Sequence, residues 1–126
     1  MEIKRTTSAF SNAEVDIYVK MLGQLRPLDT NPASIYSPST GRIGIIRHIV
    51  VCNTSGVAAT YRVFLDDDGT TYDESTAIYW DNAIGANATI LTLAQGWAMR
   101  NSGGNLAVRS SAASALTFSI FGVELR

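Results

Sequence analysis

The sequence predicts an all-β, single-domain antiparallel β-sandwich, and three observations carry that prediction. The chain has 126 residues, the size of one ordinary domain, which buries roughly two thirds of its unfolded surface around one core. Its apolar residues recur with a period of two in short runs rich in β-branched and aromatic side chains. Clusters of Gly, Asn, Asp and Ser separate these runs. About seven or eight short strands of this kind fit a two-sheet sandwich, with a jelly roll among the topologies that match.

The first strong signal is residues 14–21, EVDIYVKM, in which apolar side chains alternate with polar ones. The apolar set is Val15, Ile17, Val19 and Met21. Such alternation predicts a strand with one buried face. Ser11 followed by Glu14 also fits the capping box of a helix, but the alternation covers more residues and the strand is preferred.

Residues 42–53, RIGIIRHIVVCN, are apolar on both alternating sets. One set is Ile43, Ile45, Ile49 and Val51, and the other is Ile46, Val50 and Cys52. A strand that is apolar on both faces is expected at the centre of a sheet and covered on both sides. Cys52 is the single cysteine, and we expect a small buried hydrophobe there rather than a reactive thiol.

Residues 52–67 combine a turn-forming cluster with a second alternating run. A tight turn at Asn53 to Gly56 between two strands predicts a hairpin. The side chains expected to face the core from its second strand are Tyr61, Val63 and Leu65.

The remainder of the chain predicts four more strands, at residues 76–82, 88–94, 105–111 and 114–125. The last of these contains two apolar sets of opposite phase. The first set is Leu116, Phe118 and Ile120, and the second is Val123 and Leu125. A β-bulge at Phe121 and Gly122 would return both sets to the core, and we expect one there.

Residues 23–41 hold all three prolines of the chain and show no alternation. We expect either a long connection or an extended arm, and long irregular segments in compact domains are often functional. The expected organisation is one domain, in which residues 1–41 hold an N-terminal strand and this irregular segment, and residues 42–126 hold the sandwich core.

The most acidic stretch is FLDDDGTTYDES, residues 64–75. The calcium loop of an EF-hand needs oxygen ligands at its first and last positions, and these positions hold Phe64 and Ser75 here. An irregular calcium site remains an alternative, with the ligands Asp66, Asp68 and Asp73. The favoured interpretation is a solvated turn, because Asp-Gly is a strong turn pair and Asp side chains accept hydrogen bonds from nearby backbone N–H groups.

The sole histidine, His48, lies inside an apolar run, where we expect a half-buried strand histidine. No nucleophile motif accompanies it, and the sequence has no phosphate-binding glycine loop and no Cys/His spacing for a metal. A hydrolase using Asp66, Asp73 or Glu74 is the enzymatic alternative, but adjacent acids on a polar loop lack the environment that separates their pKa values. We therefore expect no enzyme activity, no cofactor and no metal.

Tyr79 and Trp80 are neighbours in an expected strand, so their side chains should point to opposite faces. Trp97 is expected to close one end of the sandwich. Surface aromatics would suit a carbohydrate-binding module, which stays an alternative to core packing. The arginines within strands should either pair with carboxylates across strands or face a partner protein; they are Arg47, Arg62 and Arg109.

The net charge of −1 gives no electrostatic reason to bind a polyanion, so nucleic acid is not expected as a partner. The best apolar run, IGIIRHIVV, is interrupted by Arg47 and His48 and falls short of the about 20 residues of a membrane helix, so no membrane partner is expected. The opening MEIKRTTSAF lacks the apolar segment of a signal peptide, and we expect synthesis in the cytoplasm.

Four stretches follow one another between about Arg42 and Leu125, roughly two thirds of the chain. They are a strand ending in VVCNTSGVAATYRVFL, the loop DDDGTTYDESTAIYWD, the strand ANATILTLAQG and the closing segment GGNLAVRSSAASALTFSIFGVEL. In this order they resemble small β-sandwich structural proteins of tailed bacteriophages. The resemblance implies a virion protein without catalysis, either a capsid decoration (cement) protein or a neck or tail component.

The decoration role implied by this resemblance carries further expectations. The partners would be the major capsid protein and further copies of the chain in a homotrimer at the capsid surface. Two regions are expected to make the contacts, the segment YVKMLGQLRPL and the acidic loop. The contact residues expected from them are Tyr18, Lys20, Leu22, Leu25, Arg26, Leu28, Asp66, Asp67, Asp68, Tyr72, Asp73 and Glu74.

Overall fold

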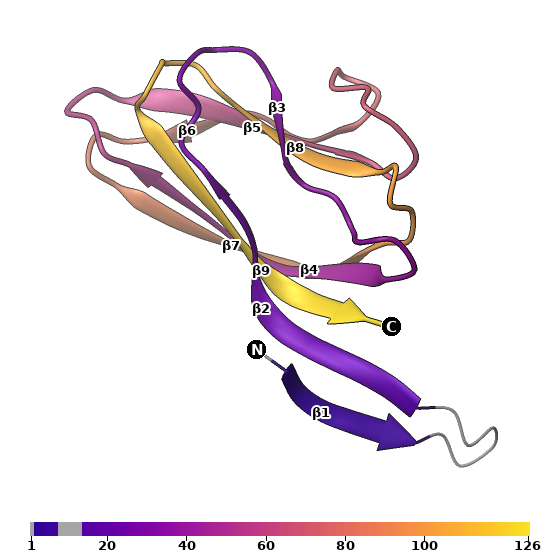
Figure 1. Ribbon diagram of the computed structural model, residues 1–126. Helices are drawn as coiled ribbons and strands as arrows, with labels where there is room; N and C mark the ends of the chain where they lie inside the picture. Colours follow the sequence, from indigo (N-terminus) through magenta and orange to yellow (C-terminus); the bar gives the residue numbers. More distant parts are fainter. Residues whose placement is uncertain (1, 8–13) are drawn as a thin grey trace.

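The computed structural model describes residues 2–7 and 14–126, and these residues form nine strands (Figure 1). The strands are β1 (Glu2–Thr7), β2 (Glu14–Leu25), β3 (Ala33–Tyr36), β4 (Ile43–Asn53), β5 (Ala59–Asp66), β6 (Ala77–Ile84), β7 (Thr89–Met99), β8 (Asn105–Ser110) and β9 (Leu116–Leu125). The predicted all-β class is confirmed. Ser11, the residue of the alternative helix cap, lies outside the described residues. Within the described part of the chain, no helix is long and apolar enough to cross a membrane.

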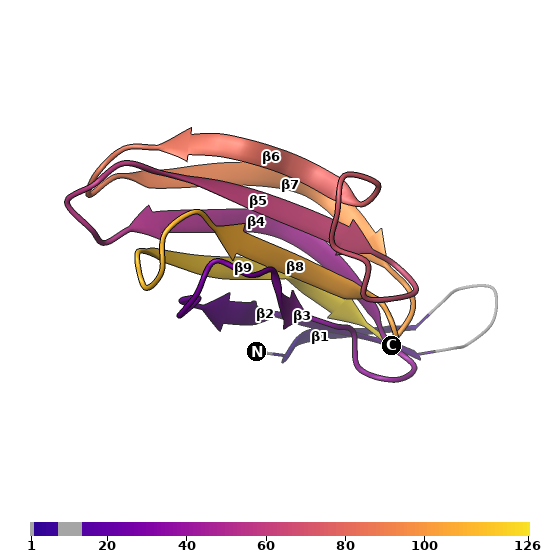
Figure 2. The ribbon, with the colours of Figure 1, turned by 90° about the horizontal axis from the view of Figure 1, so that it is seen from above.

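The strands form two antiparallel sheets that pack face to face (Figures 1 and 2). One sheet has the order β1-β2-β9-β4-β7, and the other has the order β3-β8-β5-β6. From β2 to β9, each strand crosses to the opposite sheet, except that β5 and β6 pair as a hairpin. Eight strands in two sheets with this double Greek-key order are a jelly roll, and β1 extends one edge beside β2. The predicted sandwich is therefore confirmed, with jelly-roll topology.

The hairpin predicted for residues 52–67 is wrong, because β4 and β5 belong to different sheets. The connection between them crosses the sandwich and is held by Asn53, which is 1% exposed. Its amide nitrogen donates to the carbonyl oxygens of Val57 at 2.9 Å and Gly85 at 3.1 Å, and its amide oxygen accepts from the Ser55 N–H at 2.9 Å. The turn chemistry was recognised correctly, but local turn chemistry does not determine which sheet the next strand joins.

The bulge expected in β9 lies instead on the two strands that flank it. Relative to β9, β2 carries an extra residue at Leu22, opposite Ile120 and Phe121, and β4 carries one at Arg47, opposite Phe121 and Gly122. β9 itself alternates without interruption. Val123 therefore faces away from the core, and Glu124 faces into it. Leu125 also faces outward, so the expectation that the bulge would return Val123 and Leu125 to the core is wrong.

The extra residue at Arg47 also changes the faces of β4. An insertion of one residue reverses the phase of alternation, because successive side chains in a strand point to opposite sides. The core-facing set is Ile46, Ile49 and Val51, and the opposite set is Ile43, Ile45, His48, Val50 and Cys52. β4 is central as predicted, between β9 and β7. Cys52 is half-buried rather than fully buried, because it belongs to the outward set.

The core fills the space between the sheets. Its buried members are Tyr36, Ile46, Ile49, Val51, Ala59, Tyr61, Val63, Ile84, Ala94, Met99, Leu106, Val108, Ala115, Leu116, Phe118 and Ile120. Tyr61 lies at its centre, with its ring centroid 6.0 Å from Phe118 and 6.4 Å from Tyr79 in edge-to-face geometry. Leu65, the third residue expected on this side of β5, packs against the same cluster.

Residues 23–41 connect the two sheets, which agrees with the long-connection alternative and not with an extended arm. β2 continues to Leu25, and β3 joins the edge of the four-stranded sheet beside β8. Tyr36 enters the core with 7% of its surface exposed. The Pro27 carbonyl oxygen accepts from the Ser114 N–H at 2.9 Å, which fixes the beginning of the connection to the turn before β9.

Candidate functional site

The strongest candidate site is the side of the five-stranded sheet that faces away from the core. Cross-strand pairing places its side chains in rows across β2, β9, β4 and β7. We call this surface the outer apolar face, and its apolar members are Ile17, Val19, Met21, Ile43, Ile45, Val50, Leu91, Leu93, Phe121, Val123 and Leu125. Apolar residues on both sides of the central strands were visible in the sequence, but their arrangement as one exposed surface was not predicted.

The rows follow from the register of the strands. One row is Ile17, Leu125 and Ile43, and the next is Val19, Val123 and Ile45. A third row runs through Met21, Phe121, His48 and Leu93. The side chains at the two borders are the most exposed. Met21 on β2 is 46% exposed, and Leu91 and Leu93 on β7 are 60% and 57% exposed. The other sheet lies on the opposite side, so among residues 17–126 no second layer covers this face (Figure 1).

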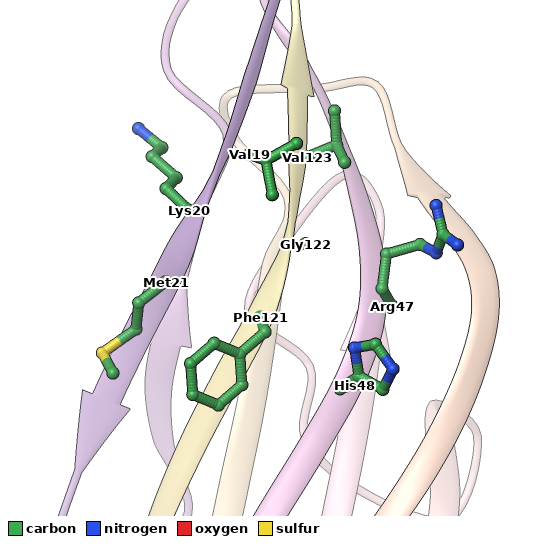
Figure 3. A pocket seen from close by; sticks show the side chains of 8 residues that line it. All are labelled: Val19, Lys20, Met21, Arg47, His48, Phe121, Gly122 and Val123. Carbon is green, nitrogen blue, oxygen red and sulfur yellow. The ribbon is translucent and has the colours of Figure 1, made fainter. Parts of the chain in front are cut away.

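A shallow groove of about 400 Å³ lies in this face where the two bulges flank β9 (Figure 3). Its lining residues are Val19, Lys20, Met21, Arg47, His48, Phe121, Gly122 and Val123. The Phe121 ring lies between Met21 and His48, and Val19 and Val123 lie side by side above it. A Cβ at Gly122 would overlap the carbonyl oxygen of Ile45, so this close approach of β4 to β9 requires glycine.

The charged groups of the groove are cationic. Lys20 directs its ammonium group away from the groove to Glu124, with Nζ 2.8 Å from Oε1. Arg47 is exposed, and the ion pairs found among residues 17–126 do not include it. His48 is half-buried, as predicted, between Phe121 and Leu93 in its row. The outer apolar face is thus a hydrophobic surface with one exposed cation.

Behind the groove, a buried carboxylate joins three strands. Glu124 on β9 is 1% exposed, and its Oε2 accepts from the Tyr36 hydroxyl at 2.7 Å. Lys20 on β2 and Arg42 before β4 supply cations at 2.8 Å and 3.4 Å. Burial alone would raise the pKa of Glu124, but hydrogen bonds from Lys20, Tyr36 and the Ser39 N–H outweigh it and lower that pKa. Burial, followed by the bond to Glu124, raises the pKa of Tyr36.

The expected contact residues of the YVKMLGQLRPL segment have mixed surroundings. Lys20 is bonded to Glu124, and Leu22 and Leu25 pack against the core. Leu22 is the extra residue of the bulge, and the reversed alternation after it turns Leu25 to the core. Tyr18 lies under Arg42, whose guanidinium carbon is 4.6 Å from the ring centroid. Arg26 donates to the Ser114 carbonyl oxygen. Leu28, at 80% exposed, is the most open of the set.

The acidic loop has the structure of a turn, and the turn interpretation is confirmed. Asp66 accepts hydrogen bonds from the N–H groups of Thr71 at 2.9 Å and Asp68 at 3.3 Å. Asp73 accepts from the Ser75 N–H at 2.8 Å. The bonds from Thr71 and Asp68 hold the pKa of Asp66 below the usual range, and the hydroxyl and then the N–H of Ser75 do the same for the pKa of Asp73. Within the described part of the chain, no group of three His, Cys, Asp or Glu side chains is arranged to hold a metal ion.

The loop also covers part of the four-stranded sheet. Phe64 points away from the core, yet it is only 1% exposed, because its ring packs 6.2 Å from both Tyr72 and Trp80. Asp67 fixes the loop to the turn before β8 by accepting from the Arg100 N–H at 3.0 Å. Asp68 and Glu74 remain exposed. The two expected contact regions therefore lie on different sheets and do not come together (Figure 1).

Among residues 17–126, the aromatic side chains do not form a stacking platform. Tyr79 packs inward between Tyr61 and Trp97, with its ring centroid 6.0 Å from that of Trp97 at the border of the core. Trp80 points to the opposite side, as predicted, under Arg62, whose guanidinium carbon is 3.6 Å from the ring centroid. Arg62 also forms a bidentate pair with Asp81, at 2.6 and 3.0 Å. The expected carboxylate pairing of Arg62 is confirmed, and Arg109 lies 3.8 Å from the same Asp81.

Comparison with known proteins adds no family assignment. No family model matches the chain, and no curated protein matches it. Among solved structures, the chain is similar to one described as the structure of infectious bursal disease virus Gx strain, with TM-score 0.47, 13% identity, and coverage of 88% of this chain and 31% of that chain. A second similarity is to the Gt strain structure, with TM-score 0.45, 11% identity and coverage of 94% and 34%. The chain thus spans about a third of the length of these structures, and the fold assignment rests on its own strand order.

Proposed function

We propose that this chain is a virion structural protein, and specifically a capsid decoration (cement) protein that binds the major capsid protein and has no catalytic role. The observation that carries the proposal is the outer apolar face, a large hydrophobic surface on a closely packed jelly roll. The resemblance to structural proteins of tailed bacteriophages supports it, because the resembling residues 42–125 supply β4 to β9.

An exposed face of this kind fits a protein that works by assembly. Contiguous apolar patches larger than a few hundred Å² are rare on soluble monomers and mark surfaces that bind other molecules. A small protein that binds only the folded shell stabilises the shell by mass action. The described residues give little support to sugar binding or to a carboxylate site. Their aromatic rings form no exposed platform for sugars. The loop carboxylates accept backbone hydrogen bonds within a solvated turn.

The proposed assembly is a homotrimer on the capsid surface. In a closed cyclic oligomer, every copy buries its exposed apolar surface against a neighbour, and the assembly does not grow into a fibre. Three copies around a threefold axis would also match the junctions between capsid subunits where a cement protein adds most to shell stability. The net charge of −1 per chain presents little electrostatic repulsion against such association.

The test is co-sedimentation of the purified protein with shells assembled from the major capsid protein of the virus that encodes it. Saturable binding at a fixed ratio to capsid subunits is expected, together with a higher temperature of shell disruption. Light scattering on the free protein at several concentrations should give three times the 13.6 kDa mass of the chain. A persistent monomer that also fails to bind shells would contradict the proposal and favour a neck or tail component.

A further inference from the structure

We infer that the outer apolar face is the surface through which copies of this chain join, with the Leu91 and Leu93 ridge of one copy packing into the groove of the next. The inference deepens the proposed function by naming the self-association surface, and it rests on the homo-oligomeric part of that proposal. It commits this face to another copy of the chain, and it assigns capsid binding to the remaining surface.

The size of the face is the first argument. Four strands about 4.8 Å apart, with rows extending about 25 Å along them, cover roughly 400 to 500 Å² of flat sheet. Protruding side chains raise the accessible area above this value, toward the about 800 Å² per partner that a standard stable interface buries. A soluble monomer rarely leaves a patch of this size exposed. The face therefore approaches the size of a standard stable interface.

The relief of the face is the second argument, because the face has both a ridge and a groove. On β7, Leu91 and Leu93 are 60% and 57% exposed and form a ridge. Beside this ridge, the groove of about 400 Å³ extends over β2, β9 and β4, and Met21, Phe121 and His48 are among its lining residues. Leucine side chains fit an apolar groove of this volume. One face thus carries both halves of an interface.

The chemical composition is the third argument. Apart from Arg47 and His48, the outward residues of the face are apolar or uncharged, and Lys20 is neutralised by Glu124 on the inner side. Permanent interfaces between copies are more apolar than transient ones and resemble a protein core cut in half. A copy of the chain is also the partner that is always present at equal concentration. These properties favour a second copy over a transient partner.

The ridge and the groove also fit the ring of three that the proposed function assumes. Each copy uses its ridge toward one neighbour and its groove toward the other, which makes the contact head to tail. In a ring of three, the outer apolar faces turn toward the shared axis and the four-stranded sheets face outward. The acidic loop, which belongs to the four-stranded sheet, then lies on the outside of the ring and remains accessible to the capsid.

The first experiment measures molar mass by light scattering for three variants. The ridge variant is Leu91→Asp with Leu93→Asp, the groove variant is Met21→Asp, and the matched control is Ile78→Asp, a 42% exposed apolar residue on β6 of the other sheet. We expect the ridge and groove variants to fall to the 13.6 kDa monomer with unchanged circular dichroism, and the control to keep the wild-type mass. A wild-type protein that is monomeric at all concentrations, or folded ridge and groove variants that keep the wild-type mass, would overturn the inference.

A second experiment remains informative if an aspartate variant does not fold. In a Cys52→Ala background, a Leu93→Cys chain is mixed with a Met21→Cys chain under mild oxidation. The inference predicts a disulfide-linked pair of the two chains as the main product. Replacing the second chain by Ile78→Cys should remove most of the product. Equal cross-linking of both mixtures, or none in either, means that copies do not join by this face.

The two proposals fail in different ways. Folded monomeric ridge or groove variants that still pellet with capsid shells would support the self-association surface and the separate capsid surface. Trimers that never bind shells would leave the inference intact and contradict the decoration role. Loss of shell binding by the Ile78→Asp control, with its mass unchanged, would place capsid contact on the four-stranded sheet.

Discussion

The two outer faces of this sandwich differ in how the chain itself completes them. On the four-stranded sheet, the outward Phe64 is covered by Tyr72 and Trp80, and Arg62 is paired with Asp81. On the five-stranded sheet, the outward Met21 remains 46% exposed. Both faces have apolar side chains at outward positions. The chain covers the first with a loop and ion pairs, and it leaves the second available to another molecule.

The largest expected effect is a difference in unfolding free energy between substitutions on the two faces. Phe64→Ala should lower the free energy of unfolding by about 3 to 4 kcal/mol, because it removes a large buried ring and leaves a cavity under the loop. Phe121→Ala should cost only about 1 kcal/mol in the free monomer, because the ring is half-buried there. Urea unfolding of both variants in the Leu91→Asp, Leu93→Asp background measures the difference. Equal losses would mean that the outer apolar face is packed as tightly as the covered one.

The next effect concerns the close approach of β4 to β9 beside the bulge at Arg47. Gly122→Ala should cost about 2 to 3 kcal/mol, because the added methyl group overlaps the Ile45 carbonyl oxygen and the backbone must shift. Gly103→Ala is the matched control, since a Cβ there meets no atom within 4 Å. Thermal unfolding compares them. If Gly122→Ala unfolds at the wild-type temperature, the close approach of β4 and β9 is not required.

A smaller effect tests the carboxylate behind the groove. Glu124→Gln should cost about 2 kcal/mol at neutral pH, because Lys20 and Arg42 lose their charged partner. The folded-state pKa of Glu124 lies below its ordinary value of 4.5, so its stabilising contribution is present above that pH and is lost as the pH falls through the lowered pKa. Unfolding measured between neutral pH and the acid range should show a smaller acid loss for the variant. Parallel pH profiles would contradict this role.

The sequence predicted the number and type of elements better than their phase. Alternation identified β2, β4 and β9, but the bulge expected in β9 placed Leu125 in the core, and the buried Glu124 was not anticipated. Single extra residues at Leu22 and Arg47 reverse the phase of the flanking strands, and a bulge leaves little signal in a run that is apolar on both sides. The candidate site could not be predicted for the same reason. Met21 was recognised as apolar, but only the register shows that it joins Phe121 and Leu93 in one exposed row.

The smallest expected effect concerns the ion pair on the outer face of the four-stranded sheet. Asp81→Asn removes the charge that pairs with Arg62 and keeps a side chain that tolerates the positive φ of 52° at this position. The pair is open to solvent, so its loss should give the smallest shift in melting temperature of these variants, and added salt should reduce even that shift. Melting curves at low and high salt measure it. A shift as large as that of Glu124→Gln would mean that the ion pair on the four-stranded face stabilises the fold as much as the buried carboxylate does, and that this face depends on charge pairing rather than on the packing of Phe64.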